Sequence, residues 1–257
     1  MSRIFERILV PTDMSDFASL PIEYALWFQR RLGSRITLLY ADDVRMPVDF
    51  MEYPLGYYLE NAPDAKSQIQ QKLRDLALEK SPDGRIETIV VDDSATRAIV
   101  DVARRMCADL IIMGTHGRSG LQRALLGSVT ESVLRSAGGP VLTIAPSLFA
   151  GSEVGIGRVL APVTMTAPAQ ELATALGAEL MLMAITDDDT PDRLLALAGR
   201  SGADLIITGS MKQLLSRRAP CAVLTLPPAW SSVTTGIVAH HGISHQRWSG
   251  FGRGRVQ

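Results

Sequence analysis

The sequence reads, from residue 110, Leu110-Ile111-Ile112-Met113-Gly114-Thr115-His116-Gly117, and after nine further residues it continues Gly127-Ser128-Val129-Thr130-Glu131. The apolar run predicts a short buried strand, and the glycines after it allow a tight turn whose backbone N–H groups can approach a phosphate. Ser128 with Glu131 three residues later matches a capping box, so we expect a helix to start at Ser128. The free N–H groups and positive dipole end of that helix then predict an anion site beside the glycine turn.

A second apolar run ends at Val10 and is followed by Pro11-Thr12-Asp13. A carboxylate just past the carboxyl end of a strand can accept hydrogen bonds from a ribose. Pro11, Thr12 and the chain near Ala41 would then flank a base. The alternative is that Asp13 caps the helix that follows.

Short apolar runs alternate with helical patterns through the first half of the chain. We expect strands at 8–11, 35–40, 86–91, 110–113 and 141–144. This alternation is typical of an α/β fold with a parallel sheet covered by helices on both faces. Such sheets bind ligands outside the carboxyl ends of their strands, where the strand order reverses. Pro21 lies within the expected first helix, so that helix should start late or kink.

Three blocks of the first half return in the same order in the second half: 7–14 as 158–165, 108–114 as 203–209, and 141–144 as 223–226. We therefore expect two copies of one unit, at 1–147 and 157–228, joined through a Gly- and Ser-containing stretch. The second copy has candidate strands at 158–161, 180–185, 205–208 and 222–226. It lacks a counterpart of the strand at 86–91 and of the helix before it.

The composition excludes several classes of protein. The 257 residues carry a formal net charge of −1, with 46% apolar and 21% charged residues, which excludes a fully disordered chain. This charge gives no overall field for a polyanion, so nucleic acid is not expected as a partner. The apolar runs are far shorter than the roughly 20 residues that span a bilayer, so no membrane segment is expected.

The chain start and the cysteines point to a cytoplasmic protein without a disulfide framework. The N-terminal residues carry spaced charges and no signal-like apolar stretch. Cys107 and Cys221 each lie beside an apolar run. We expect both to be small buried residues rather than nucleophiles or metal ligands.

Taken together, the glycine spacing, Pro11-Thr12-Asp13 after the first strand and Pro140-Val141-Leu142 at the last resemble the ATP-binding branch of the universal stress protein family. The resemblance covers the first copy nearly from end to end and the second copy in part. It implies a Rossmann-like open sheet in the order 3-2-1-4-5, with ATP, accompanied by Mg²⁺, between the first and fourth strands. Proteins of this family dimerise through the last strand, so the two copies are expected to pair internally as a pseudo-dimer, with a homodimer as a further possibility.

The resemblance also implies roles for individual residues. Asp13 would hold the ribose, and Pro11, Thr12 and Ala41 the adenine. The remaining implied nucleotide-binding residues lie at and after the fourth strand, mostly around the phosphates: Met113, Gly114, His116, Gly117, Arg118, Gly127, Ser128, Val129 and Thr130.

The second copy departs from the family pattern. Thr164 stands at the position matched to Asp13, and Lys212 stands where a second glycine would follow Gly209. We therefore expect no ATP there and interpret the second copy as a shortened partner of the first, with 223–226 as the pairing strand.

Three further features leave alternatives open. His116 and Arg118 could bind a phosphate or point into water. Residues 46–58 are rich in aromatic residues and could cover the adenine, meet a partner or pack on their own domain. Residues 229–257 combine basic residues, histidines and glycines; we expect a disordered tail, with binding of single-stranded RNA or of a metal as alternatives.

These observations predict an ATP-binding protein that acts in stress response or signalling. Nucleotide occupancy would set the conformation of 114–127 and thereby which protein partner is bound. A slow ATP-hydrolysing enzyme is one alternative, although no Gly-x-x-x-x-Gly-Lys loop is present and no Lys lies between Gly114 and Ser128. The other alternative is an interaction module that binds no nucleotide. No catalytic residue or protein metal ligand is predicted.

Overall fold

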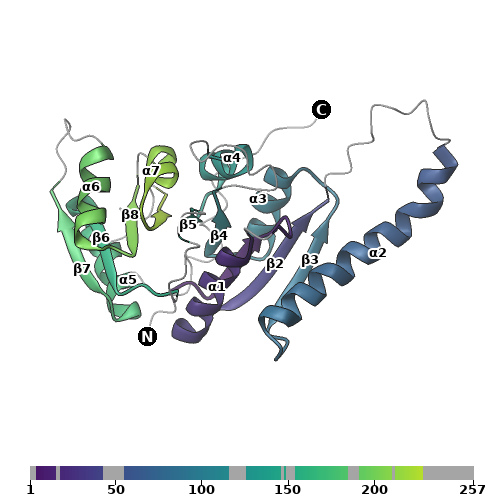
Figure 1. The fold of residues 1–257 in the computed structure, drawn as a ribbon, viewed down its shortest axis with the longest axis horizontal. Coiled ribbons are helices and arrows are strands. Elements are labelled where there is room, and N and C mark those ends of the chain that lie inside the picture. Colours follow the sequence, from purple (N-terminus) through teal and green to yellow (C-terminus); the bar gives the residue numbers. More distant parts are fainter. Residues whose placement is uncertain are drawn as a thin grey trace.

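The computed structural model describes residues 4–15, 18–42, 55–115, 126–145, 148, 154–184, 191–209 and 212–227, with the backbone alone at 55–65 and 212–214. The described strands join into a single sheet that has helices on both faces (Figure 1). Three segments discussed above lie outside the described residues: 46–54 of the aromatic segment, 116–125 of the glycine-containing loop, and the tail 229–257. The interpretations of those segments therefore stay predictions.

The first half alternates strands with helices. Its elements are β1 (Arg7–Pro11), α1 (Ser19–Leu32), β2 (Arg35–Ala41), α2 (Leu55–Lys80), β3 (Ile86–Val91), α3 (Ala95–Arg105), β4 (Leu110–Gly114), α4 (Ser128–Ser136) and β5 (Val141–Ile144). The strands match the expected apolar runs to within a residue. The late start of the first helix is confirmed, because α1 begins at Ser19 and so has Pro21 in its first turn, where a missing N–H breaks no helical bond.

The second half contains fewer elements. They are β6 (Arg158–Pro162), the 3-10 turn η3 (Val163–Met165), α5 (Thr166–Leu176), β7 (Glu179–Met183), α6 (Pro191–Ser201), β8 (Leu205–Thr208), α7 (Lys212–Arg218) and β9 (Ala222–Thr225). Within its described residues there is no counterpart of α2 or β3, as predicted. The strand expected at 180–185 starts one residue earlier, because the Glu179 N–H donates to the Gly157 carbonyl at 2.8 Å.

The strand order is β3-β2-β1-β4-β5-β9-β8-β6-β7. Its first five positions confirm the expected order 3-2-1-4-5 of a doubly wound α/β sheet. Neighbouring strands are parallel except for β5 and β9, which pair antiparallel with Leu142 opposite Leu224. The expected pairing strand at 223–226 therefore lies against β5, and it joins the two sets of strands.

Two aspartates that correspond in the sequence repeat accept the same kind of backbone hydrogen bonds in the two halves. The Asp109 carboxylate accepts the backbone N–H groups of Glu6 and Arg7, both at 2.9 Å. The Asp204 carboxylate likewise accepts those of Gly157 and Arg158, both at 2.9 Å. Each aspartate thus ties the start of the first strand of its half to the turn before β4 or β8.

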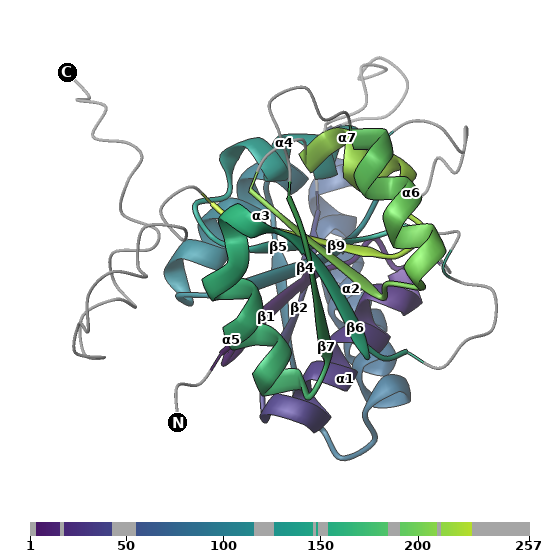
Figure 2. The ribbon, with the colours of Figure 1, turned by 90° about the vertical axis from the view of Figure 1, so that its left-hand side faces the viewer.

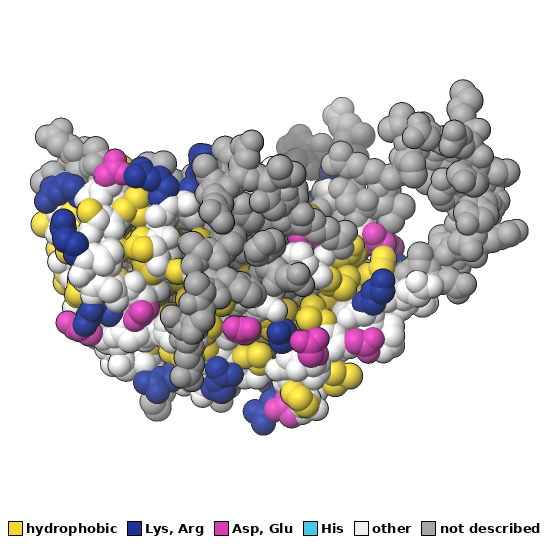
Figure 3. All heavy atoms as spheres, in the orientation of Figure 1, with side chains coloured by type: hydrophobic (Ala, Val, Ile, Leu, Met, Phe, Trp, Pro, Cys, Tyr) yellow, Lys and Arg dark blue, Asp and Glu magenta, His cyan; other side chains and the backbone are white. Residues whose placement is uncertain are grey.

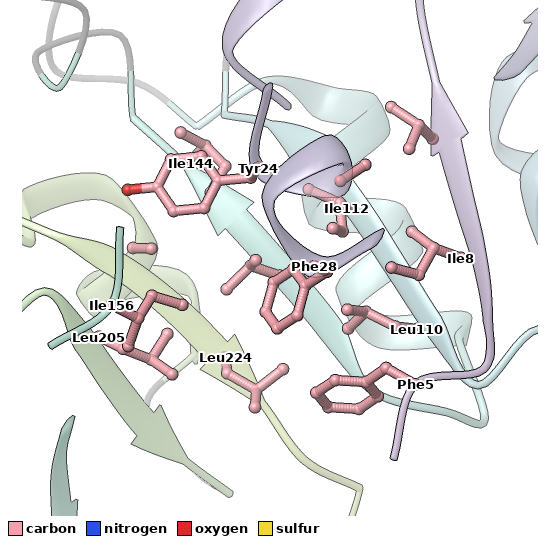
Figure 4. Close-up of a cluster of buried hydrophobic side chains, with 14 of the residues drawn as sticks. Phe5, Ile8, Tyr24, Phe28, Leu110, Ile112, Ile144, Ile156, Leu205 and Leu224 are labelled. Carbon is pink, nitrogen blue, oxygen red and sulfur yellow. The ribbon is translucent and has the colours of Figure 1, made fainter. Parts of the chain in front are cut away.

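One apolar cluster continues through both halves on the face covered by α1, α2 and α5. Figure 4 shows Phe28 of α1 beside Leu224 of β9, and both side chains are almost fully buried. The opposite face carries two separate clusters, one under α3 and α4 and one under α6 and α7. Figure 2 shows α6 and α7 on one side of the strands and α5 on the other.

One of the two cysteines differs from the expectation. Cys221 is buried as predicted, but Cys107 is only half-buried, so the prediction for Cys107 is wrong. Cys107 follows the end of α3 with a left-handed φ of 51°, a position at the edge of the core where a turn reverses the chain. Among the described helices, none is both long and apolar enough to cross a membrane.

Candidate functional site

A cavity of about 440 Å³ opens at the carboxyl ends of β1 and β4. β1 pairs with β2 on one side and with β4 on the other, so this is the point where the strand order reverses. The described lining residues come from three strand ends and from the starts of three helices: Pro11, Thr12, Asp13, Ala18, Pro21, Leu39, Tyr40, Ala41, Ala95, Ile99, Met113, Gly114, Gly127, Ser128, Val129 and Thr130. Every predicted site residue within the described part of the chain is among them.

The loop after β1 is held by a backbone hydrogen bond to β2 and by its own side chains. The Thr12 N–H donates to the Leu39 carbonyl at 2.9 Å, which continues the β1–β2 ladder past Pro11. Asp13 Oδ1 accepts both the N–H and the hydroxyl of Ser15, at 3.0 and 2.7 Å. Met14 has a left-handed φ of 57°, an unfavourable conformation for a residue with a side chain. The loop is therefore fixed in a specific shape at the rim of the cavity.

The alternative role of Asp13 as a helix cap is wrong. The N-cap of α1 is Ala18, which makes no side-chain capping bond. Asp13 instead closes a local turn with Ser15 and lines the cavity, five residues before that cap.

The chain from β4 to α4 brings the second group of predicted residues to the same cavity. The Thr115 N–H donates to the Ile144 carbonyl at 2.9 Å, and the Gly127 N–H returns to the Thr115 carbonyl at 2.8 Å. This closure sets Gly127 beside the end of β4. The first turn of α4 therefore begins at the cavity wall with its free N–H groups at that end.

The predicted capping box is wrong by one position. The N-cap of α4 is Gly127, with φ −58° and ψ 140°, and Ser128 is the first helical residue. Glu131 cannot then reach back to the cap, and its carboxylate accepts from Arg135 at 2.6 Å instead. The physical reason is that a glycine without a side chain already adopts the extended cap geometry here. The helix still begins at Ser128, as predicted.

Thr130 has a structural contact that the sequence did not indicate. Its hydroxyl donates to the Gly114 carbonyl at 2.8 Å, and the residue is buried. Its proton is thus committed to joining α4 to the end of β4. Val129 and Ser128, one and two positions nearer the helix start, also line the cavity.

Sequence reasoning missed six lining residues: Ala18, Pro21, Leu39, Tyr40, Ala95 and Ile99. The sequence analysis named Ala41 at the end of β2, but not Leu39 and Tyr40, which precede it in the same strand. Ala95 and Ile99 are one turn apart at the start of α3, so the apolar face of that helix was a usable signal. Pro21 was considered only as a disturbance of α1.

Charges and metal ligands are sparse in the described lining. Asp13 is the one carboxylate there, and none of the described lining residues is basic. Over the described part of the chain, no group of three His, Cys, Asp or Glu side chains could hold a metal ion. His116, Gly117 and Arg118 lie outside the described residues, so their placement relative to the cavity is untested.

The corresponding strand ends of the second half are arranged differently. A Cβ atom at Gly209 would overlap the terminal methyl group of Met165, so this buried side chain fills the space beside the turn after β8. Thr164, matched to Asp13, belongs to η3 and is exposed. Among the described residues of the second half, Thr164 therefore replaces the carboxylate, and Met165 occupies the space beside Gly209.

Comparisons with known proteins agree with this arrangement. A family model described as the universal stress protein family matches residues 4–145. Universal stress protein MJ0577 of Methanocaldococcus jannaschii is 29% identical over 163 residues, covering 56% of this chain and 97% of the relative. Universal stress protein MJ0531 of the same organism is 30% identical over 142 residues, covering 55% and 82%.

A solved structure extends the likeness of fold into the second half. The crystal structure of a universal stress protein from Archaeoglobus fulgidus superposes with a TM-score of 0.63 at 20% identity, over 86% of this chain and 98% of that one. At this identity the match concerns the fold alone.

Proposed function

Because this chain belongs to the universal stress protein family, we propose that its first half binds one ATP with Mg²⁺ and that nucleotide occupancy sets what the protein binds in stress response or signalling. The observation that carries this proposal is that Asp13, Gly114 and the start of α4 line one cavity. Its volume of about 440 Å³ lies within the range of small-molecule sites.

The apolar part of the lining suits the adenine ring. Leu39 and Ile99 belong to the buried cluster under α3, and both reach the cavity wall together with Ala41. A flat purine gains from leaving water between aliphatic side chains of this kind. We assign the base to this part, with Pro11 and Thr12 beside it.

Asp13 suits the ribose. Ser15 fixes one carboxylate oxygen through two hydrogen bonds, so the orientation of the carboxylate is set before any ligand arrives. A hydrogen bond from a sugar hydroxyl to a charged acceptor contributes about 1.5–3 kcal/mol. This preset acceptor supports a sugar ligand over a bare phosphate.

The start of α4 suits the phosphates. Its free N–H groups and positive dipole end adjoin Gly114 and Gly127, where the backbone can approach closely. Ser128 is not the cap of the helix, so its hydroxyl is not needed for capping. Mg²⁺ usually takes most of its ligands from phosphates and water, which fits a lining with a single carboxylate.

We further propose that 157–228 is a shortened repeat of 1–147 that binds no ATP. The order of the strands, the matched roles of Asp109 and Asp204, and the antiparallel β5–β9 junction support a common unit. The Met165 side chain beside Gly209 argues against a ligand in the second half. The expected stoichiometry is therefore one nucleotide per chain.

Equilibrium dialysis with ATP and Mg²⁺ tests the proposal on the full chain. The double variant Asp13→Ala, Gly127→Ala should lose most of the binding, because it removes the sugar acceptor and crowds the phosphate end. Thr164→Ala, the matched change in the second half, should bind as the wild type does. Equal retention by all three proteins, or none by any, would contradict the proposal.

The same samples separate the two alternatives. Release of phosphate at several turnovers per second, within the ordinary enzyme range, would identify an ATP-hydrolysing enzyme instead. Absence of any thermal shift with ATP and Mg²⁺ would favour an interaction module without a nucleotide.

A further inference from the structure

Strand β7 holds in the second half the place that β2 holds in the first. Each strand pairs in parallel with the first strand of its half, from Arg35 opposite Arg7 and from Glu179 opposite Arg158. In these registers, Leu180 of β7 corresponds to Ile36 of β2, and Leu182 corresponds to Leu38.

In the first half these positions are covered. Ile36 and Leu38 are 1% and 0% exposed, and they share a cluster with Leu73 and Ala77 of α2. β3 pairs along the outer edge of β2 over six residues. A strand and a helix thus bury the residues that correspond to Leu180 and Leu182.

In the second half the same positions are open. β7 is the last strand at its end of the sheet, and no described segment pairs with its outer edge. Leu182 is 44% exposed and Leu180 is half-buried. Since alternate residues of a strand share a face, the two leucines form one strip on the α5 side, which we call the β7 strip. Figure 3 shows the end of the molecule that carries α6 and β7, where hydrophobic side chains lie at the surface among charged ones.

We propose that the β7 strip and the adjoining sheet edge bind a second copy of this chain, so that two β7 strands pair antiparallel about a twofold axis. Pairing centred on Met181 places Leu180 opposite Leu182 of the partner subunit, on the same face. Each leucine then packs beside a leucine of the partner subunit. The two sheets become continuous through hydrogen bonds between edge strands.

The charges of β7 favour a copy of itself as the occupant. Leu180–Met183 carry no charge, so a symmetric pair sets no like charges opposite one another. Glu179, the charged residue of β7, is neutralised within its own chain by Arg158 Nε at 3.0 Å. A twofold contact also closes after two copies, whereas a heterologous contact would continue into a filament.

The chain already contains a junction of this kind. β5 and β9 pair antiparallel about Leu142 and Leu224, two residues that correspond in the sequence repeat. An edge-to-edge antiparallel contact between equivalent strands is therefore a geometry that this sheet accommodates. At β7 the equivalent strand is not in the same chain, and a second copy supplies it.

Analytical ultracentrifugation of the full chain over a wide range of concentrations tests the proposal. The wild type should form a discrete dimer, and Leu182→Lys should raise its dissociation constant by at least about tenfold, because each interface contains two copies of the residue. Leu78→Lys is the matched control, since Leu78 is also exposed, at 51%, but lies on α2. It should dimerise as the wild type does.

Crosslinking provides a second measurement on protein that keeps a small apolar side chain at 182. In a Cys107→Ser background, Leu182→Cys should crosslink to its copy with a short thiol reagent, because diagonal neighbours in such a pair lie about 7–8 Å apart. Leu78→Cys should not. A wild type that stays monomeric, a dimer unaffected by Leu182→Lys, or open-ended aggregates in place of a dimer would each overturn the proposal. None of these outcomes depends on nucleotide binding.

Discussion

Thr225 and Thr143 give the sharpest test of how the two halves are joined. Both threonines are buried at the β5–β9 junction, and they correspond in the sequence repeat. The Thr143 hydroxyl bonds to Ser216 Oγ at 2.8 Å and lies 3.3 Å from the Val223 carbonyl oxygen. Within the described part of the structure, the Thr225 hydroxyl has no hydrogen-bond partner.

The asymmetry follows from one substitution between the halves. In the sequence repeat that matches Thr143 with Thr225, Leu134 of α4 corresponds to Ser216 of α7. Leu134 and Ser216 are both buried. A leucine side chain has no atom that can hydrogen-bond, so the hydroxyl of Thr225 lacks the partner that Ser216 gives to Thr143. An unsatisfied buried hydroxyl costs about 1–3 kcal/mol.

Thr225→Val should therefore raise the free energy of unfolding by about 1–2 kcal/mol, since it removes the unpaired hydroxyl and adds a buried methyl group. Thr143→Val should lower the free energy of unfolding by about 1 kcal/mol, since it breaks a hydrogen bond and leaves the buried Ser216 hydroxyl without this partner. Urea denaturation measures both changes, and thermal scans should show shifts of about 2–4 °C per kcal/mol with opposite signs. A destabilised Thr225→Val together with a neutral Thr143→Val would refute this reasoning.

Three further predictions concern other parts of the molecule. Asp109→Ala should destabilise the fold by about 2–3 kcal/mol in urea denaturation, because two backbone N–H groups lose a charged acceptor; a loss below about 0.5 kcal/mol would contradict this. Gly33→Ala should cost about 1 kcal/mol in the same assay, since φ is 75° and no neighbouring atom obstructs a Cβ, and Gly33→Asn should cost less. Burial raises the pKa of Cys221 and of Tyr24 to about 12 each; the charge of Asp204 adds to both shifts, and that of Cys221 adds to the shift of Tyr24. The folded state therefore keeps protons that the unfolded chain releases at the ordinary pKa values of 9.0 and 10.0. Stability should be intact below pH 9 and fall as the pH rises toward 12, and Tyr24→Phe should flatten that fall in urea midpoints measured up to about pH 11; an unchanged slope would count against it.

The strands and the position of the cavity could be predicted from the sequence because both depend on local patterns. A run such as Leu110–Gly114 is apolar throughout, which is typical at this length of a strand buried on both faces. The carboxyl ends of parallel strands meet at one edge, so finding Asp13 and Gly114 past two strand ends was enough to expect them at one site.

The predictions that failed depend on competition between neighbouring residues for one role, or on contacts between residues distant in the sequence. Ser128 and Gly127 are both good caps, and a sequence pattern cannot tell which one the closure of the turn onto Thr115 selects. Ile99 reaches the cavity because α3 packs against β2, a contact that no local pattern records. The half-burial of Cys107 likewise depends on where α3 ends relative to the core.

Native mass spectrometry of the freshly purified full chain, before and after addition of ATP and Mg²⁺, tests nucleotide binding most directly. The expected result is a mass increase of one ATP per chain in the wild type and in Thr164→Ala, which is lost in the Asp13→Ala, Gly127→Ala variant. A chain that gains no nucleotide, or that gains two, would contradict a single site at the ends of β1 and β4.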